Sequence, residues 1–455
     1  MSQRARQLGA LALVWVLVAA CAGSESGGVS VGPGVDAGSK TIRVGVNTDL
    51  SGIFTTHSLR AAEGHVAYWE WLNDRGGIRG WQIEPVVMDN GYDVAAHVEN
   101  YEVMSGDGPN SVVMFSVSTG SPQNEAIVDR LAEDEMAAVP FSRHSRWADA
   151  EMGSNLFETL VNYCVEAMNG ATHMAEAHGD KVALVSFDNE YGRDSAEGLR
   201  IAAEAKGLEI VYDAGGAISS GDNLDGVISR IAASGADWVW LGTSPETTVA
   251  LLVGAEKAGF EGQWSGSAPS WSPLLLLTQA RWVADTSYTH VAAAQLWNVG
   301  DSQGMQEMVW ALRQYRPRAA FDDLYVYSWI QGYVTTQILD RAIADGDLTR
   351  AGVLAAAGKI TADLKGLGPD QSWSGEPDDI IARGSYIYDV DLSLYAHSLL
   401  PEEMYDFDLG VDGIDVEFDE WGHTVGSDHA NAGYRLIKGP YVSDVARDWN
   451  YRPCS

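Results

Sequence analysis

The sequence predicts an α/β protein with two lobes, each built on a parallel sheet that helices cover. From residue 41 onward, short apolar runs rich in β-branched residues alternate with segments of helical periodicity. Near residue 158 this alternation stops and then starts again. Because strands that alternate with helices usually pair in parallel, two such units predict two sheets with a cleft between them.

The first unit begins with a strand at 41–47. The helix expected at 58–77 has apolar residues at three- and four-residue spacing and ends at Gly76-Gly77. The helix expected at 121–136 opens with Ser121-Pro122, an N-cap followed by proline. The other strands are expected at 81–90, 111–116 and 137–142, and the remaining helix at 93–107.

The second unit shows the same alternation of strands and helices. Strands are expected at 181–187, 208–215, 237–242 and 263–268, with helices at 162–179, 195–207, 224–234 and 246–259. A strand-like run at 288–297 and helices at 305–317 and 323–346 then bring the chain back to the first lobe.

The N-terminus has the pattern of an export signal. Residues 1–20 carry two arginines, an apolar run too short for a membrane span, and small residues before Cys21. This order resembles a bacterial lipobox, in which the cysteine is lipidated and becomes the mature N-terminus. The Gly/Ser-rich residues 21–40 are then a flexible tether, and the protein is exported and anchored to the outer face of the cell membrane. An ordinary signal peptide with an incidental cysteine is the alternative.

Two cysteines remain if Cys21 is lipidated. Cys164 and Cys454 would then share an oxidising compartment, where a disulfide between them is one hypothesis and two unrelated thiols are the other.

The composition excludes several classes of function. The formal net charge of −34 disfavours nucleic acid and anionic membrane surfaces as partners. The ten histidines are scattered without metal-ligand spacing, and no serine-hydrolase elbow, zinc-protease motif or phosphate-binding loop occurs. We therefore expect no enzyme activity, no metal and no cofactor. An exported hydrolase is the least favoured alternative, since it would need a nucleophile and a base in the cleft.

Five stretches together resemble a known family. They are IRVGVNTDLSG (42–52), NDRGGIRGWQIEPVVMDN (73–90), VPFSRHS (139–145), VSFDNEYGRDSAEGL (185–199) and FDEWGHTVG (418–426). In order and spacing they are similar to the branched-chain amino acid (Leu/Ile/Val) binding proteins of ABC transporters. The resemblance implies the type I periplasmic binding fold, with two Rossmann-like lobes joined by a three-strand hinge. It also implies a monomer that closes on a small solute and delivers it to a permease and ATPase.

The resemblance also implies domain boundaries. Lobe 1 would comprise 41–157 and 291–427, with an insertion at about 361–412, and lobe 2 would comprise 158–290 and 428–455.

Carried onto this sequence, the family's ligand contacts fall in loops after strands. The first-lobe residues are Ser118, Thr119, Ser142, Arg143, His144 and His57, and the second-lobe residues are Tyr191, Thr243 and Ser244. Hydroxyls and free backbone N–H groups at a helix start suit a carboxylate or carbonyl oxygen. Tyr191 would offer a ring and a hydroxyl to the solute, although a ring packed in the core is the alternative.

Two departures from the family put a plain branched-chain amino acid in doubt. Arg143 and His144 stand where the family has small residues. The loop 265–271 holds no acid to pair with a ligand ammonium, and Glu246 is the nearest substitute in the sequence. The expected ligand is therefore a branched-chain amino acid, another amino acid, or an amide or carboxylate without a cation. A sensor that signals instead of importing is the alternative function.

Overall fold

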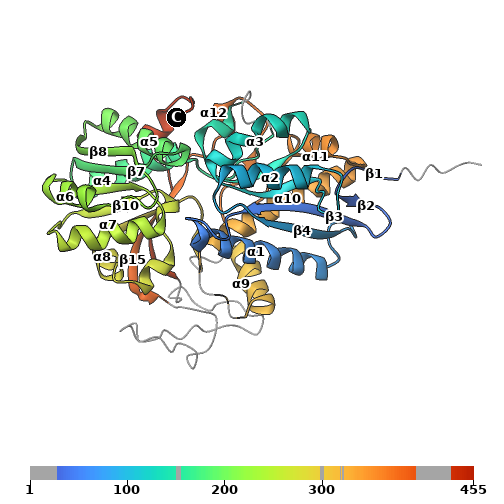
Figure 1. The fold of residues 1–455 in the computed structure, drawn as a ribbon, viewed down its shortest axis with the longest axis horizontal. Coiled ribbons are helices and arrows are strands. Elements are labelled where there is room, and N and C mark those ends of the chain that lie inside the picture. The colour runs from blue at the N-terminus through green and yellow to red at the C-terminus, as the bar shows by residue number, and fades with distance from the viewer. Residues whose placement is uncertain (1–27, 150–154, 298–301, 318, 320–321, 396–431) are drawn as a thin grey trace, which may run out of the picture.

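The computed structural model describes residues 28–149, 155–297, 302–317, 319, 322–395 and 432–455. The expected signal peptide 1–20, Cys21 and the stretch 418–426 lie outside these residues. The described chain forms two α/β lobes side by side (Figure 1).

The sheet of lobe 1 is centred on β3 (Thr41–Thr48). It pairs in parallel with β4 (Gln82–Asp89) and β5 (Met114–Thr119), and β5 pairs in parallel with β6 (Ala138–Phe141). The helices around this sheet are α1 (Thr55–Asp74), α2 (Val94–Ser105), α3 (Ser121–Glu133), α9 (Gln303–Tyr315), α10 (Leu324–Asp345) and α11 (Arg350–Ala357).

Lobe 2 is built on a seven-stranded sheet in the order β16-β15-β11-β10-β9-β7-β8. The five parallel strands are β7 (Lys181–Phe187), β8 (Glu209–Ile218), β9 (Trp238–Gly242), β10 (Gln263–Gly266) and β11 (Tyr288–Ala292). β15 (Ser385–Tyr395) and β16 (Ala432–Tyr441) add two antiparallel strands. The helices are α4 (Tyr163–His178), α5 (Glu190–Lys206), α6 (Asp225–Ala233), α7 (Pro245–Lys257), α8 (Arg281–Ser287) and α13 (Asp444–Asp448).

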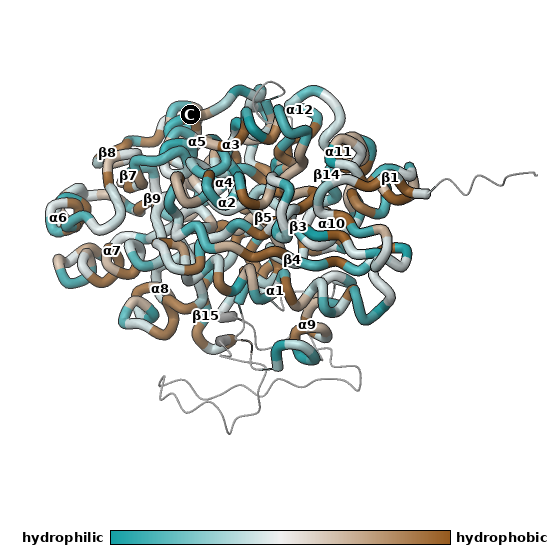
Figure 2. Tube along the Cα trace, turned by 45° about the vertical axis from the view of Figure 1, so that its right-hand side comes forward, coloured by the Kyte–Doolittle hydropathy of each residue, from teal (hydrophilic) through white to brown (hydrophobic). Residues whose placement is uncertain are grey.

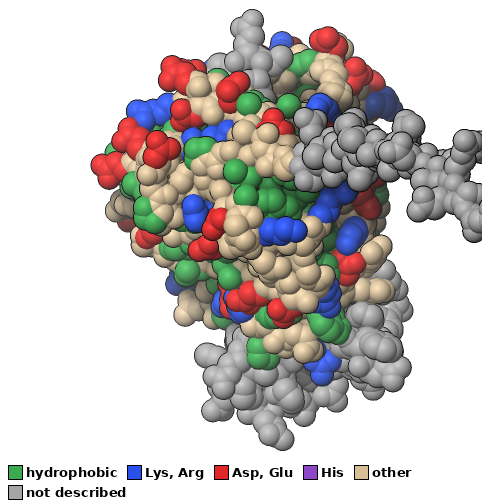
Figure 3. Space-filling model, turned by 90° about the vertical axis from the view of Figure 1, so that its right-hand side faces the viewer, with side chains coloured by type: hydrophobic (Ala, Val, Ile, Leu, Met, Phe, Trp, Pro, Cys, Tyr) green, Lys and Arg blue, Asp and Glu red, His purple; other side chains and the backbone are tan. Residues whose placement is uncertain are grey.

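Hydrophobic residues concentrate along the inner strands, whereas much of the periphery is hydrophilic (Figure 2). The strands β5 and β9 are buried along their whole length, as expected for parallel strands covered on both faces. On the end of lobe 1 that Figure 3 shows, acidic and basic side chains are interspersed, in keeping with a solvated surface.

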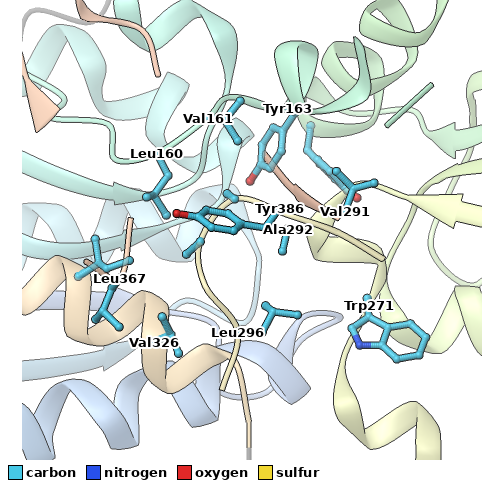
Figure 4. Packing of buried hydrophobic residues seen from close by; sticks show 14 of the residues in the cluster. Leu160, Val161, Tyr163, Trp271, Val291, Ala292, Leu296, Val326, Leu367 and Tyr386 are labelled. Carbon is cyan, nitrogen blue, oxygen red and sulfur yellow. The ribbon is translucent and has the colours of Figure 1, made fainter. Parts of the chain in front are cut away.

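Among the described residues, three segments cross between the lobes. Residues 155–162 lead from β6 to α4, residues 293–297 lead away from β11, and residues 381–384 lead into β15. Val161 and Ala382, on two of these segments, form a parallel bridge. Figure 4 shows residues of the first two segments, including Leu160 and Leu296, packed with lobe 1 side chains such as Val326 and Leu367. The crossovers thus share one hydrophobic cluster with both lobes.

Two expectations were wrong: that residues up to 40 form only a flexible tether, and that the whole stretch 361–412 belongs to lobe 1. Residues 28–40 are not a plain tether, because β1 (Ser30–Val31) pairs with β12 (Asp347–Leu348) and β2 (Val35–Asp36) pairs with β3. Only part of the stretch 361–412 belongs to lobe 1. The pair β13 (Thr361–Ala362) and β14 (Gln371–Ser372) packs at α10, whereas β15 joins lobe 2, since the edge of β11 offers an unpaired strand face there.

The chain end lies against lobe 2. A disulfide joins Cys164, at the start of α4, to Cys454. The terminal residues it fastens reach a lobe 1 loop, where the Cys454 amide donates to Ser145 Oγ and the Tyr451 hydroxyl donates to the Ser145 carbonyl.

Candidate functional site

A cavity lies where the two lobes meet. It encloses about 840 Å³, part of which is open to solvent. Residues of both lobes line it, and most of the large ones are aromatic: Phe54, Tyr92, Phe141, Tyr163, Tyr191, Trp271 and Tyr327. A mostly aromatic lining with a few polar groups is typical of a small-molecule site.

The first wall is the start of α3. Gly120 precedes this helix with φ 103, and no side chain caps its N-terminus. The hydroxyls around it bond to each other: Ser121 Oγ lies 2.7 Å from Ser142 Oγ, and Thr119 Oγ1 lies 2.7 Å from Thr48 Oγ1. Trp147 Nε1 also donates to Ser142 Oγ. The predicted contact hydroxyls of Thr119 and Ser142 are therefore already hydrogen-bonded within the protein.

Arg143 is the cation of the cavity wall. Only 8% of it is exposed, and its guanidinium lies 5.2 and 5.3 Å from the ring centroids of Tyr163 and Tyr327. Its Nη2 lies 3.5 Å from Glu166 Oε1, across the boundary between the lobes. Burial opposes the charge, but the carboxylate of Glu166 and the neighbouring tyrosines raise the pKa of Arg143 above its usual value. Nη1 has no hydrogen-bond partner among the described residues.

Glu166, in the first turn of α4, is fully buried behind Arg143. Its Oε2 accepts hydrogen bonds from Ser267 Oγ at 2.7 Å and from the Ala268 amide at 3.0 Å. Burial raises the pKa of Glu166, and Arg143 and these hydrogen bonds oppose the rise. The loop 265–271 contains no acidic residue of its own, and Glu166 of α4 places a carboxylate against it.

Asp323 is the carboxylate that lines the cavity directly. It accepts hydrogen bonds from the Tyr434 hydroxyl and, at 3.0 Å, from the Trp297 amide. Burial raises its pKa to about 7.

The two histidines of the lining are uncharged at neutral pH. Burial lowers the pKa of His57 to about 4 and that of His290 to about 3. His57 Nε2 donates to the Trp271 carbonyl at 2.7 Å, a hydrogen bond that ties α1 of lobe 1 to the β10 loop of lobe 2. Among the described lining residues, Arg143 is therefore the sole cation at neutral pH.

Five of the nine expected contact residues reach the cavity wall: His57, Thr119, Ser142, Arg143 and Tyr191. Tyr191 is both a lining and a core residue. It is 2% exposed, its hydroxyl donates to the Thr243 carbonyl at 3.1 Å, and its ring lies edge-on to Phe54 of lobe 1.

The other four lie outside the lining. Ser118 Oγ bonds to His97 Nε2, and His144 Nε2 bonds to Ser455 Oγ. Thr243 Oγ1 bonds to Thr248 Oγ1, and Ser244 caps α7. Glu246, the substitute acid, is exposed and away from the cavity.

Sequence reasoning missed several polar residues of the lining, among them Asp323, His290 and two residues within helices. Gln331, on α10, has neither amide atom hydrogen-bonded within the described residues, although it is 1% exposed. Ser58 Oγ, on α1, is likewise buried without a partner there. Their positions within helices gave no loop signal.

The family described as "Periplasmic binding protein" matches residues 41–393. The chain belongs to the periplasmic binding protein family. It is 22% identical over 228 residues to a leucine-, isoleucine-, valine-, threonine- and alanine-binding protein of Pseudomonas aeruginosa. That alignment covers 50% of this chain and 60% of the relative, less than two thirds of its length.

Solved structures of periplasmic binding proteins share the fold. A fatty acid ABC transporter substrate-binding protein from Thermomonospora curvata has a TM-score of 0.77 and 24% identity, covering 94% of this chain and 98% of its own. A branched-chain amino acid ABC transporter protein from Thermus thermophilus with bound valine has a TM-score of 0.69 and 17% identity, covering 90% and 98%. These likenesses show the two-lobed fold, as the sequence predicted.

Neither a membrane-spanning helix nor a metal-binding cluster occurs among the described residues of this periplasmic binding protein. No helix there is long and apolar enough to cross a membrane. No group of three or more His, Cys, Asp or Glu residues there is placed to hold a metal ion.

Proposed function

We propose that the protein is an exported solute receptor that captures a small molecule between its lobes and delivers it to an ABC permease and its ATPase. The observation that carries this proposal is the cavity between two lobes that three short segments connect. The names of the relatives given above refer to amino acids or a fatty acid, which supports small organic acids and amino acids as candidate cargo.

Capture would work by closure of the lobes. Contacts such as His57 to the Trp271 carbonyl and the Ser145 amide to Asp194 Oδ2 (3.1 Å) join the lobes beside the cavity. A solute held by both walls favours the state in which these contacts form, and so shifts the population toward closed molecules. The permease would then select the closed, loaded form.

Export with a lipid on Cys21 completes the proposal. The lipid would hold the protein at the outer face of the membrane, close to the permease, as a monomer. Intact-mass measurement of the protein purified from membranes tests this step, since lipidation adds a diacylglyceryl group to the Cys21 thiol and a signal peptidase then cleaves off residues 1–20.

The solute screen tests the function itself. A thermal-shift screen of amino acids, amides and carboxylic acids should find at least one solute that raises the melting temperature, because a ligand at a hundredfold excess over its Kd stabilises the folded state by about 2.7 kcal/mol. Small-angle X-ray scattering should show a smaller radius of gyration with that solute. If no solute in a broad screen stabilises or compacts the protein, the proposed function is contradicted.

A further inference from the structure

One cation, Arg143, is among the described lining residues of the cavity, and neighbouring groups hold it in place on several sides. Arg143 is held between two tyrosine rings and paired with Glu166 from the opposite lobe. A guanidinium between aromatic faces is oriented as well as charged, so its remaining N–H groups point in set directions. Nη1 is the group that the described protein leaves without a hydrogen-bond partner.

The two carboxylates at the site are already engaged by the protein. Glu166 Oε2 accepts from Ser267 and Ala268, whereas Oε1 has no hydrogen bond among the described residues and faces the charge of Arg143 Nη2 at 3.5 Å. Asp323 has the Tyr434 hydroxyl and the Trp297 amide. Glu166 is outside the lining, so a ligand ammonium would reach it only by displacing Arg143, and at Asp323 it would compete with two donors that are already bonded.

The groups left over suit an acceptor. Besides Arg143 Nη1, the amide of Gln331 and the hydroxyl of Ser58 are buried without described partners, and both can donate. The start of α3, with no side-chain cap, adds a positive helix end to the same cavity. The seven aromatic residues of the lining offer apolar surface to the rest of a ligand.

We propose that the cavity binds a monocarboxylate with an apolar body and no ammonium group, whose carboxylate accepts a hydrogen bond from Arg143 Nη1. Glu166 then serves as the internal counter-ion that holds the guanidinium in place. The proposal rests on the proposed solute-binding function and narrows its cargo from amino acids and acids in general to acids without a cation.

Matched pairs of probes test the missing ammonium. Isothermal titration would compare 3-phenylpropanoate with phenylalanine, and 4-methylpentanoate with leucine. In each pair the acid should bind at least about tenfold more tightly, because the amino acid carries one unpaired charge into the site. The uncharged 3-phenylpropanamide should bind about tenfold more weakly than its acid, since it lacks the charge-assisted bond to Arg143.

Paired variants separate Arg143 from general effects on folding. Arg143→Met alone would leave Glu166 buried without its counter-ion, so Arg143→Met is combined with Glu166→Gln. This double variant should keep its fold by circular dichroism and lose about ten- to hundredfold in affinity for 3-phenylpropanoate, with little change for the amide. The control is Arg146→Met with Glu125→Gln, a nearby ion pair at 2.7 Å that is outside the lining.

The single variant Glu166→Gln should change the affinity for the acid in the opposite direction. It removes the carboxylate that competes for the guanidinium, and so should strengthen acid binding severalfold.

Three results would overturn the inference. Amino acids that bind as tightly as their matched acids would overturn it and leave the solute-binding function standing. An acid affinity that the Arg143→Met/Glu166→Gln variant leaves unchanged would also overturn it. If neither series binds, the inference is wrong, and the broad solute screen then decides the proposed function separately.

Discussion

The two walls of the cavity differ in what their polar groups do. On the lobe 1 wall, Ser58, Arg143 and Gln331 each keep a buried polar atom without a described partner. On the lobe 2 wall, the Tyr191 hydroxyl is bonded to the Thr243 carbonyl, and only His290 Nδ1 is comparably free among the described lining residues. An unpaired buried donor costs stability unless a ligand satisfies it, and we therefore infer that lobe 1 supplies most of the polar contacts to the ligand. Lobe 2 adds the rings of Tyr163, Tyr191 and Trp271 to the aromatic residues of lobe 1.

The largest expected effect is on the free energy of unfolding, and it tests how much the disulfide of lobe 2 stabilises the fold. Replacing Cys164 and Cys454 by alanine removes a cross-link between residues 290 positions apart and should lower the free energy of unfolding by about 4 kcal/mol, because the unfolded chain regains entropy. Urea unfolding measures the loss. Ligand affinity should change less than about threefold, since no lobe 1 donor is touched. Equal stability with and without the cysteines would contradict this view of lobe 2.

A pH titration tests the contact between the walls. Burial raises the pKa of Asp194, which accepts from Ser145, to about 7, and the hydrogen bonds from Ser145 oppose the rise. The pKa of this carboxyl group is higher in the folded protein than in the unfolded chain, where it is about 3.9. Its contribution to the unfolding free energy is therefore complete below about pH 3.9 and is lost as the pH rises through about 7. Asp194→Asn should therefore flatten the fall in unfolding free energy between pH 4 and 7, by on the order of 2 kcal/mol.

The control for this titration is Asp340→Asn, at an exposed ion pair with Arg79. That variant should keep the slope of the wild type. A slope that Asp194→Asn leaves unaltered would show that the buried contact does not govern the pH dependence.

Gln331→Leu tests the lobe 1 wall. It replaces an amide without described partners by an apolar side chain of similar size, so the unliganded protein should be as stable as the wild type or more so. The affinity for the bound acid should fall about tenfold. Calorimetry and thermal melting of the same sample measure both quantities, and a large loss of stability would show that Gln331 has a structural partner.

Tyr191→Phe is the reciprocal change on the lobe 2 wall, and its effect should be the smallest. Losing the hydroxyl that bonds to Thr243 and Ser270 should cost about 1 kcal/mol of stability and leave ligand affinity within about threefold. A strong loss of affinity with unchanged stability would reverse the comparison of the walls.

The sequence was sufficient for the fold because hydrophobic periodicity reports burial in strands and helices directly. It was weaker at the site because neighbouring residues of an extended chain point to opposite sides. Thr119 reaches the cavity, and Ser118, one residue earlier on β5, bonds to His97 instead. In the same way Arg143 lines the cavity and His144, in extended backbone, bonds to Ser455.

Contacts between segments far apart in the chain could not be predicted from the sequence. Glu166 meets Ser267 about a hundred residues away, so its role depends on the packing of α4 against the β10 loop. The placement of β15 in lobe 2 also depends on strand pairing across the chain, which local pattern does not encode.

Closure of the lobes on an acid without an ammonium group can be followed directly as a change in the distance between them. Spin labels on Glu99→Cys and Ser229→Cys, exposed positions on α2 of lobe 1 and α6 of lobe 2, would report the distance between the lobes by double electron–electron resonance. We expect 3-phenylpropanoate to narrow the distance distribution and shift it to shorter distances, and phenylalanine at the same concentration to leave it unchanged. The same closure with phenylalanine, or closure with phenylalanine alone, would contradict it.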